Sequence, residues 1–145
     1  MKYKKIELLD IPELAELYIE TFNSEPWNDK WTKETAEKRL HQMINVEGFY
    51  GLCAYKDDKL CGMILGCEEQ FYNGKTFNIR EFCVSNKLRG NGLGTKIFNK
   101  FEEELRKKQI KEIYLVTVRG DMTEHFYHKQ KVSNREQYVV MGKEI

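Results

Sequence analysis

Three glycines that alternate with other residues, directly after an arginine, restrict the fold more than any other feature of this chain. They lie in "VSNKLRGNGLGTKIF", residues 84–98. The preceding run "TFNIREFCV" has the aromatic and β-branched residues of a strand. The following apolar residues recur at helical spacing: Leu93, Ile97, Phe98, Phe101 and Leu105. The chain must therefore pass from a strand into an amphipathic helix through glycine-rich backbone.

Such a junction is suited to an anion. The first N–H groups of a helix lack partners, and the helix dipole favours negative charge there. Glycines let a phosphate approach the backbone without a Cβ clash, and Arg89 adds a positive charge. The segment therefore predicts a phosphate or pyrophosphate site, although neither the GxxxxGK[ST] string nor the GxGxxG spacing is present. A glycine-rich turn without a ligand is the alternative.

The remaining pattern predicts a single α+β domain over residues 1–145. Antiparallel strands come first and a β-α-β crossover second, which gives a mixed sheet covered by helices. Helices are expected after Asp10 and after Thr32, each of which can cap a helix start. A further helix is expected in the glycine segment and a short one at 123–130. Strands are expected at 2–9, 48–56, 59–72, 76–84, 112–118 and 135–145.

Charge and cysteine content exclude several classes of partner. The net charge is +1, so the chain lacks the strong positive field of many nucleic-acid-binding proteins. No stretch approaches the roughly 18 apolar residues of a membrane span, so we expect neither nucleic acid nor a membrane as partner. The four cysteines form no CxxC pair and no cluster with histidine, so we expect no metal and a reducing, cytoplasmic location.

The pattern Arg89-x-x-Gly92-x-Gly94, after a strand that ends in Val84, resembles the pyrophosphate loop of the GCN5-related N-acetyltransferase (GNAT) superfamily. The resemblance covers nearly the whole chain, through "IREFCVSNKLRGNGLGTKIFNKFEEEL" and "IYLVTVRGDMTEHFYHKQKV". A weaker likeness links "FNSEPWNDKWTKETAEKRL" to members related to aminoglycoside 6'-N-acetyltransferases. The resemblance implies a mixed, mostly antiparallel central sheet with helices on both faces.

The resemblance also implies a chemistry: acetyl transfer from acetyl-CoA, as co-substrate, to the primary amine of a small molecule. A backbone N–H at Cys83 or Val84 would stabilise the oxyanion. Tyr127 would protonate the departing thiolate, unless it is an ordinary core tyrosine. Carried over residue by residue, the expected cofactor-binding positions are Phe82, Cys83, Val84, Arg89, Gly90, Asn91, Gly92, Leu93, Gly94, Thr95 and Tyr127.

The acceptor side has two candidate residues, Glu81 and Trp27. Glu81 lies three residues before Val84 and could take the proton of the amine; alternatively it pairs with Arg80, Arg119 or a lysine. Trp27 could hold an ammonium group, which would suit a small cationic amine such as a polyamine or an aminosugar. The alternative is that the tryptophans pack and the acids are solvated. The acids behind this hypothesis are Glu20, Glu25, Asp29, Glu68 and Glu69.

One departure from the family pattern lies after the Phe-Tyr pair. Lys131 stands where the family usually has glycine, and Val132 where it usually has phenylalanine. The turn into the last strand is therefore expected to be reshaped. For this reason a second function stays open, a non-catalytic acyl-CoA-binding module. The resemblance also admits a homodimer.

Overall fold

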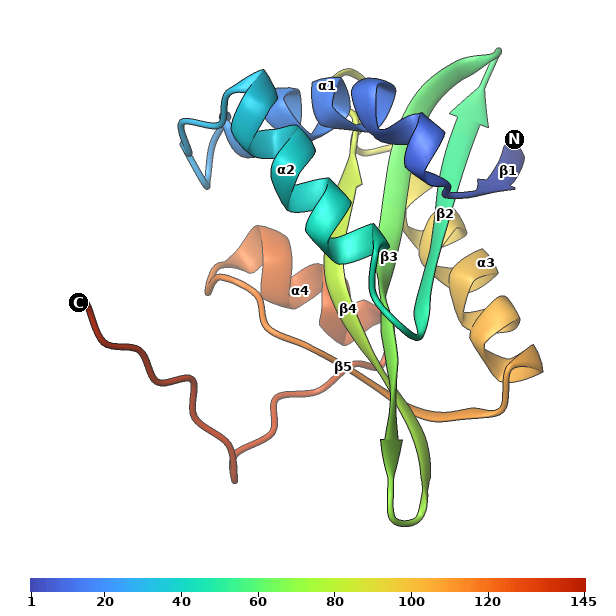
Figure 1. The fold of residues 1–145 in the computed structure, drawn as a ribbon, viewed down its shortest axis with the longest axis vertical. Coiled ribbons are helices and arrows are strands. Elements are labelled where there is room, and N and C mark those ends of the chain that lie inside the picture. Colours follow the sequence, from blue (N-terminus) through green and yellow to red (C-terminus); the bar gives the residue numbers. More distant parts are fainter.

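The structure, a computed structural model, describes all 145 residues, Met1–Ile145. Its centre is a five-stranded sheet in which the strands lie in chain order, β1-β2-β3-β4-β5 (Figure 1). All neighbouring strands are antiparallel except β4 and β5, which are parallel. The strands are β1 (Lys2–Lys5), β2 (Phe49–Lys56), β3 (Lys59–Phe71), β4 (Gly74–Val84) and β5 (Ile110–Leu115).

Four α-helices cover both faces of this sheet (Figure 1). The first two pack on one face, and the third, which connects β4 to β5, packs on the other. The predicted α+β fold, with a mostly antiparallel mixed sheet between helices, is confirmed. The helices are α1 (Ile11–Phe22), α2 (Lys33–Ile44), α3 (Leu93–Lys107) and α4 (Asp121–Lys129); two single 3₁₀ turns are η1 (Leu8–Asp10) and η2 (Asn86–Leu88).

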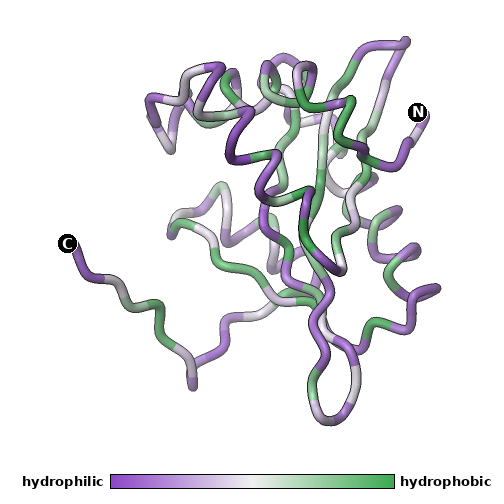
Figure 2. The backbone as a smooth tube through the Cα atoms, viewed as in Figure 1, coloured by the Kyte–Doolittle hydropathy of each residue, from purple (hydrophilic) through white to green (hydrophobic).

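The central strands are apolar on both sides because each side meets a helix. Met63 and Leu65 of β3 face the core under α1 and α2, whereas Ile64 between them faces the core under α3. This explains why β2 and β3 read as nearly continuous hydrophobic runs in the sequence, which Figure 2 shows as green tube through the middle of the molecule. No helix is long and apolar enough to cross a membrane.

The helix starts behave partly as predicted. Thr32 caps α2, since its hydroxyl accepts a hydrogen bond from the Thr35 N–H at 3.1 Å. Asp10 precedes α1 as expected, but its carboxylate accepts from the Glu7 N–H at 2.8 Å and from Lys4 and makes no cap of α1. The apolar face of α3 is buried as the periodicity predicted.

The C-terminal segment differs from its prediction. Residues 135–145 form no strand, although "REQYVVMGKEI" has the composition of one. The segment leaves α4 and extends away from the body (Figure 1), with Tyr138 and Met141 exposed. β5 also starts earlier than expected and ends at Leu115, so Val116 and Val118 lie outside the sheet and are exposed. A strand exists only where its backbone finds a partner, and the β5 edge is left unpaired here.

Candidate functional site

The candidate site lies where β4 and β5 separate. The two strands pair from Lys75 and Ile110 up to Ile79 and Leu115. Beyond Ile79, β4 continues to Val84 while β5 has ended. The register between β3 and β4 is also interrupted, because Leu65 pairs with Glu81 and Gly66 with Ile79. The end of β4 thus borders a gap in the sheet. This end consists of Glu81, Phe82, Cys83 and Val84.

The glycine-rich loop follows directly from this strand end. Gly90 and Gly92 adopt left-handed φ angles of 87° and 69°, which L side chains rarely take. A Cβ built on either glycine would meet nothing within 4 Å, so the backbone faces open space. Gly92 begins α3 without any side-chain cap. The loop therefore presents free N–H groups and the positive end of a 15-residue helix to whatever enters that space.

Gly94 serves a different purpose from the other two glycines. A Cβ on Gly94 would lie 3.1 Å from the ring of Phe126 on α4. Its absence lets the start of α3 approach α4 closely, which brings the loop and α4 to one place. Thr95, one residue further on, accepts a hydrogen bond from the Gln130 amide at 3.0 Å and ties the same two helices together.

Arg89 is held at the loop by an aromatic contact. Its guanidinium lies 5.7 Å from the ring centre of Trp27, within the range of a cation–π interaction. Trp27 in turn packs against Phe22 of α1, with 5.0 Å between the ring centres. The structure therefore associates Trp27 with the loop arginine and the core under α1. It does not bring Trp27 to the cluster around Glu81 described next.

Glu81 is the centre of a hydrogen-bonded cluster that joins three elements. Its Oε1 accepts from the Tyr18 hydroxyl of α1 at 2.9 Å and from the Arg39 Nε of α2 at 3.2 Å. A terminal nitrogen of Arg39 lies 3.1 Å from the same oxygen, and Arg39 Nε also donates to the Tyr18 hydroxyl. All these contacts use one carboxylate oxygen, so Oε2 has no protein partner.

Burial and the neighbouring donors act in opposite directions on the pKa of Glu81. Burial raises the pKa of the Glu81 carboxyl above its ordinary value, while the hydrogen bond from Tyr18 and the charge of Arg39 act in the opposite direction. The Glu81 side chain is only 11% exposed. A carboxyl with a raised pKa, one fixed oxygen and one free oxygen has the properties required of a proton acceptor.

Tyr127 lies on α4 and packs against the core under α3. Its ring packs edge-on against Phe126 and Phe98, with centroids 5.2 and 6.4 Å away. The hydroxyl has no hydrogen-bond partner in the protein. Burial raises the pKa of Tyr127, and the charge of Glu81 raises it further. Tyr127 therefore stays protonated at neutral pH and has a proton to donate.

The other β4 positions can serve a ligand only through their backbone. The Cys83 side chain is fully enclosed in the core under α1, where burial raises the pKa of its thiol. Phe82 points to the opposite side and packs against Phe98 and Phe126. Val84 also faces that side. Asn91 and Leu93 lie in the glycine loop, and Leu93 is buried.

A cavity of about 270 Å³ opens beside this cluster. Arg80 follows the last residue of β4 that pairs with β5, and Val116 follows the end of β5. The cavity thus lies in the gap between the strands. Its lining consists of Arg39, Asn78, Ile79, Arg80 and Val116.

The acids that suggested a cationic acceptor do not gather at this cavity. Glu68 pairs with Lys75 at 3.1 Å, and Glu69 accepts from the Tyr114 hydroxyl at 2.6 Å. Asp29 accepts from the indole N–H of Trp31 at 3.0 Å. None of these residues lines the cavity. No group of three or more potential metal ligands occurs in the structure.

Sequence reasoning missed three residues of this site. Tyr18 and Arg39 were not considered as site residues, and Arg80 was considered only as a partner of Glu81. The partner of Glu81 is instead Arg39, 42 positions earlier in the chain. A usable signal existed for Arg39, because a charged residue directly before Leu40, on the inward side of α2, needs a partner when it is half-buried.

Comparisons with known proteins extend this picture. The profile of the Acetyltransferase (GNAT) family matches residues 11–131. No curated protein sequence matches significantly. Among solved structures, the chain is similar to the aminoglycoside acetyltransferase meta-AAC0020 from an uncultured soil metagenomic sample, with 19% identity and a TM-score of 0.76 over 99% of this chain and 95% of that chain.

Two further solved structures share the fold. A possible acetyltransferase from Clostridium difficile 630 has 15% identity and a TM-score of 0.82, with 99% of this chain and 97% of that chain covered. The aminoglycoside 6'-N-acetyltransferase AAC(6')-IG from Acinetobacter haemolyticus has 18% identity and a TM-score of 0.74, with 100% and 99% covered. At such identities the likeness concerns the fold alone.

Proposed function

The chain belongs to the GNAT acetyltransferase family, as its glycine-rich motif predicted, and we propose that it transfers an acetyl group from acetyl-CoA to the primary amine of a small molecule. The observation that carries this proposal is the coincidence of three features. The left-handed glycines open onto free space, α3 begins there without a side-chain cap, and the end of β4, which has no partner on its β5 side, leads directly into that loop.

The loop fits the pyrophosphate of acetyl-CoA. Backbone N–H groups between Arg89 and Thr95 would bind phosphate oxygens, and Gly90 and Gly92 leave room for them. Arg89, fixed over Trp27, adds a positive charge. When bound, acetyl-CoA supplies the activated acetyl group as a thioester. The end of β4, at Cys83 and Val84, is paired with β3 and has no partner on its β5 side, and this side would direct the thioester carbonyl toward the gap beside β5.

Glu81 and Tyr127 would carry out the two proton transfers, Glu81 as acceptor and Tyr127 as donor. The amine must lose a proton to attack, and the free Oε2 of Glu81 would accept it, directly or through a water. As the new C–N bond forms and the C–S bond breaks, negative charge passes to the sulfur. Tyr127 would donate its hydroxyl proton to that sulfur, and both groups would then return to their starting states by exchange with solvent.

The acceptor itself is a small molecule with a primary amine. A polyamine or aminosugar remains the sequence-based proposal, and the aminoglycoside acetyltransferases among the structural neighbours support it. The side chains support it less, because three of the five acids involved, Glu68, Glu69 and Asp29, are engaged elsewhere. The four free cysteines suit a reducing compartment, so we propose a cytoplasmic location. We also propose a homodimer, for which the exposed C-terminal segment and the free β5 edge provide the surfaces.

The alternative of an acyl-CoA-binding module without turnover rested on Lys131 and Val132. Lys131 nevertheless adopts the left-handed φ of 64° that suits glycine. Val132 packs against the core under α3, and its N–H donates to the Tyr127 carbonyl at 3.0 Å. The turn after Tyr127 thus forms with Lys131 in a position that suits glycine, which supports enzymatic function as the stronger proposal.

Thiol release from acetyl-CoA, measured with a panel of primary amines, tests the transfer. Binding of acetyl-CoA, measured by calorimetry, tests the loop separately through Gly92→Asp and its matched control Gly92→Asn. Both variants add a similar side chain where space is open, and only Asp adds negative charge. We expect Asp to weaken binding at least about tenfold relative to Asn, or about 1.4 kcal/mol. Binding without amine-dependent thiol release would favour the module; equal affinities of the two variants would remove the pyrophosphate site.

A further inference from the structure

We propose that the acceptor carries an anionic group, such as a carboxylate, in addition to its amine, and that Arg80 and Arg39 bind this group in the cavity beside Glu81. The inference rests on the proposed acetyl transfer and names the class of acceptor for the same site. It follows from the charges and the free hydrogen-bond donors of the cavity.

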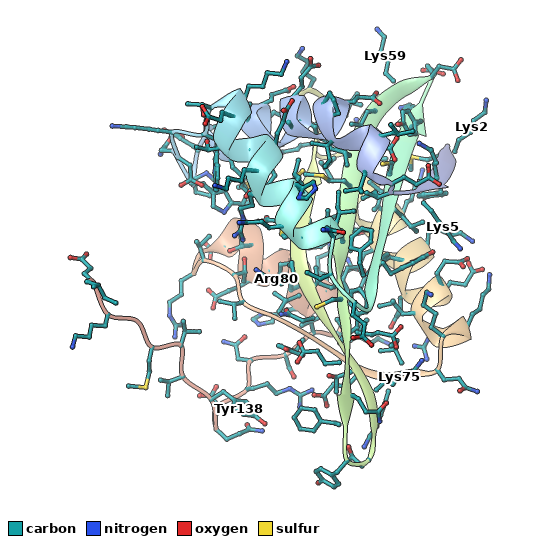
Figure 3. The ribbon with its side chains drawn as sticks, in the orientation of Figure 1. Lys2, Lys5, Lys59, Lys75, Arg80 and Tyr138 are labelled. Carbon is teal, nitrogen blue, oxygen red and sulfur yellow. The ribbon has the colours of Figure 1, made fainter.

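Arg80 is a charged side chain without a partner at this cavity. It makes no hydrogen bond and no ion pair with the rest of the protein. It lines the cavity next to Glu81 in the chain, and Figure 3 labels it beside β4, in the region between α2 and α4. All five N–H donors of its guanidinium are therefore available to a ligand.

Arg39 contributes a second set of donors on the opposite side of the cavity. Its Nε and one terminal nitrogen contact Glu81. The other terminal nitrogen makes no contact with an acceptor, and 37% of the side chain is exposed. Arg39 thus connects the proton acceptor to the cavity, since the same guanidinium that holds Oε1 of Glu81 can also contact a bound anion.

The balance of charge favours an anion. Two arginines line the cavity, and no carboxylate does. Glu81 neutralises one positive charge by its pairing with Arg39, whereas Arg80 forms no ion pair. A second ammonium group in this space would face the guanidinium of Arg80. A carboxylate would instead accept paired N–H bonds, the geometry in which guanidinium groups bind most strongly.

The dimensions of the cavity favour a short molecule. Its volume of about 270 Å³ is slightly below the range of roughly 300–1,000 Å³ that is typical of small-molecule pockets. The remaining lining is apolar at Ile79 and Val116, with one amide at Asn78. An amine at Glu81, a few methylene groups along Ile79 and Val116, and an anion at Arg80 would fill this space.

Three amines of equal length test the proposal: 4-aminobutanoate, butylamine and putrescine, which end in a carboxylate, a methyl group and an ammonium group. With the wild-type protein we expect the highest kcat/KM for 4-aminobutanoate. Arg80→Gln should lower this value at least about tenfold more than it lowers that of butylamine, and Arg80→Lys should restore part of the difference. Arg106→Gln, on the exposed last turn of α3, removes the same charge at a distance and should change nothing.

Binding of butanoate provides a readout that does not require turnover. Its carboxylate should shift the amide NMR signals of Asn78 and Val116 in the wild-type protein and not in Arg80→Gln. If this binding occurs but no amine releases thiol, the anion site stands and the proposed transfer fails. If amines are acetylated without preference for 4-aminobutanoate, or if Arg80→Gln weakens acetyl-CoA instead, the transfer stands and the anionic acceptor is wrong.

Discussion

Glu81 and Tyr127, the two proposed proton-transfer residues, are held in different ways. Glu81 is fixed by hydrogen bonds from Tyr18 and Arg39, whereas Tyr127 is fixed only by ring contacts to Phe98 and Phe126. Substitutions at Tyr127 can therefore remove its hydroxyl without disturbing a hydrogen-bond network. Substitutions at Tyr18 or Arg39, by contrast, would remove a hydrogen bond that positions Glu81 and would also change the pKa of Glu81.

Tyr127→Phe keeps the ring packing and removes the proton donor. We expect kcat to fall by about 10²–10⁴-fold, the usual contribution of a general acid, with acetyl-CoA affinity and unfolding temperature nearly unchanged. Steady-state kinetics and calorimetry give the two values. Since the raised pKa makes Tyr127 a weaker acid, solvent could instead protonate the sulfur, and a variant with wild-type kcat under conditions where chemistry limits turnover would assign that role to water.

Tyr18→Phe tests Glu81 through its pKa. The Tyr18 hydroxyl donates to the ionised carboxylate and thereby lowers a pKa that burial raises. Loss of the hydroxyl should raise the pKa of Glu81 further, so the base becomes protonated over a wider pH range. We expect the acidic break in log kcat/KM against pH to move upward, and activity to fall more at low pH than at high pH.

Stability should respond to the same substitution, because a buried hydrogen bond to a charged group is lost, at a cost of about 1.5–3 kcal/mol. The two measurements separate the roles of Glu81. A lower unfolding temperature combined with an unmoved acidic break would make Glu81 a structural ion-pair partner of Arg39 and not the base.

Which side chains form the site was predictable only where the signal was local. The glycine loop could be predicted because Gly90 and Gly92, which adopt left-handed φ angles, directly precede the helix in the chain. The pairing of Glu81 with Arg39 depends on how α2 lies against β4, which no spacing within either segment encodes. Trp27 illustrates the same limit, because its contact with Arg89 joins residues that are 62 positions apart.

Among the secondary-structure elements, the C-terminal end of α4 shows most clearly how one residue affects local stability. The Lys131 N–H donates to the His128 carbonyl and the Val132 N–H to the Tyr127 carbonyl, each at 3.0 Å. This is the Schellman arrangement, whose left-handed position usually holds glycine. Lys131 occupies it with a φ of 64°, at a cost of roughly 1–2 kcal/mol for a residue with a Cβ.

Lys131→Gly should therefore stabilise the protein. Part of the gain is offset by the greater freedom of glycine in the unfolded chain, so we expect about 0.5–1 kcal/mol and an unfolding temperature higher by a few degrees. Lys129→Gly, two residues earlier and inside α4, is the matched control and should destabilise by a similar amount. Calorimetry on both variants decides the matter; a loss of stability in Lys131→Gly would contradict the left-handed turn.

Helices were more predictable than strands for a physical reason. The apolar faces of α1, α2 and α3 and the Thr32 cap depend on residues within a few positions of one another. A strand needs a partner supplied by another part of the chain. Residues 135–145 have strand composition but no such partner, and β5 stops at Leu115 where the parallel pairing to β4 ends.

The chain as a whole leaves one apolar surface uncovered. Tyr138, Val139, Val140 and Met141 are 73–87% exposed, and Figure 2 shows hydrophobic colour in this segment, away from the body. The only link between the segment and the sheet is Arg135, 3.6 Å from Glu112 of β5. An unpaired edge strand and an unpaired strand-like segment in one molecule are complementary in hydrogen bonding.

These features predict that two copies associate through strand addition, the segment 135–145 of one protomer lying along the β5 edge of its partner. Light scattering coupled to size exclusion should give a dimer mass at micromolar concentrations. Val140→Pro removes a backbone N–H from the new ladder and should yield a monomer, whereas Val140→Thr keeps the N–H and the β-branched side chain and should remain dimeric. Because residues 133–145 make no core contacts, neither variant should unfold the monomer. A monomeric wild type, or a Val140→Pro variant as dimeric as the wild type, would assign the exposed segment to another partner.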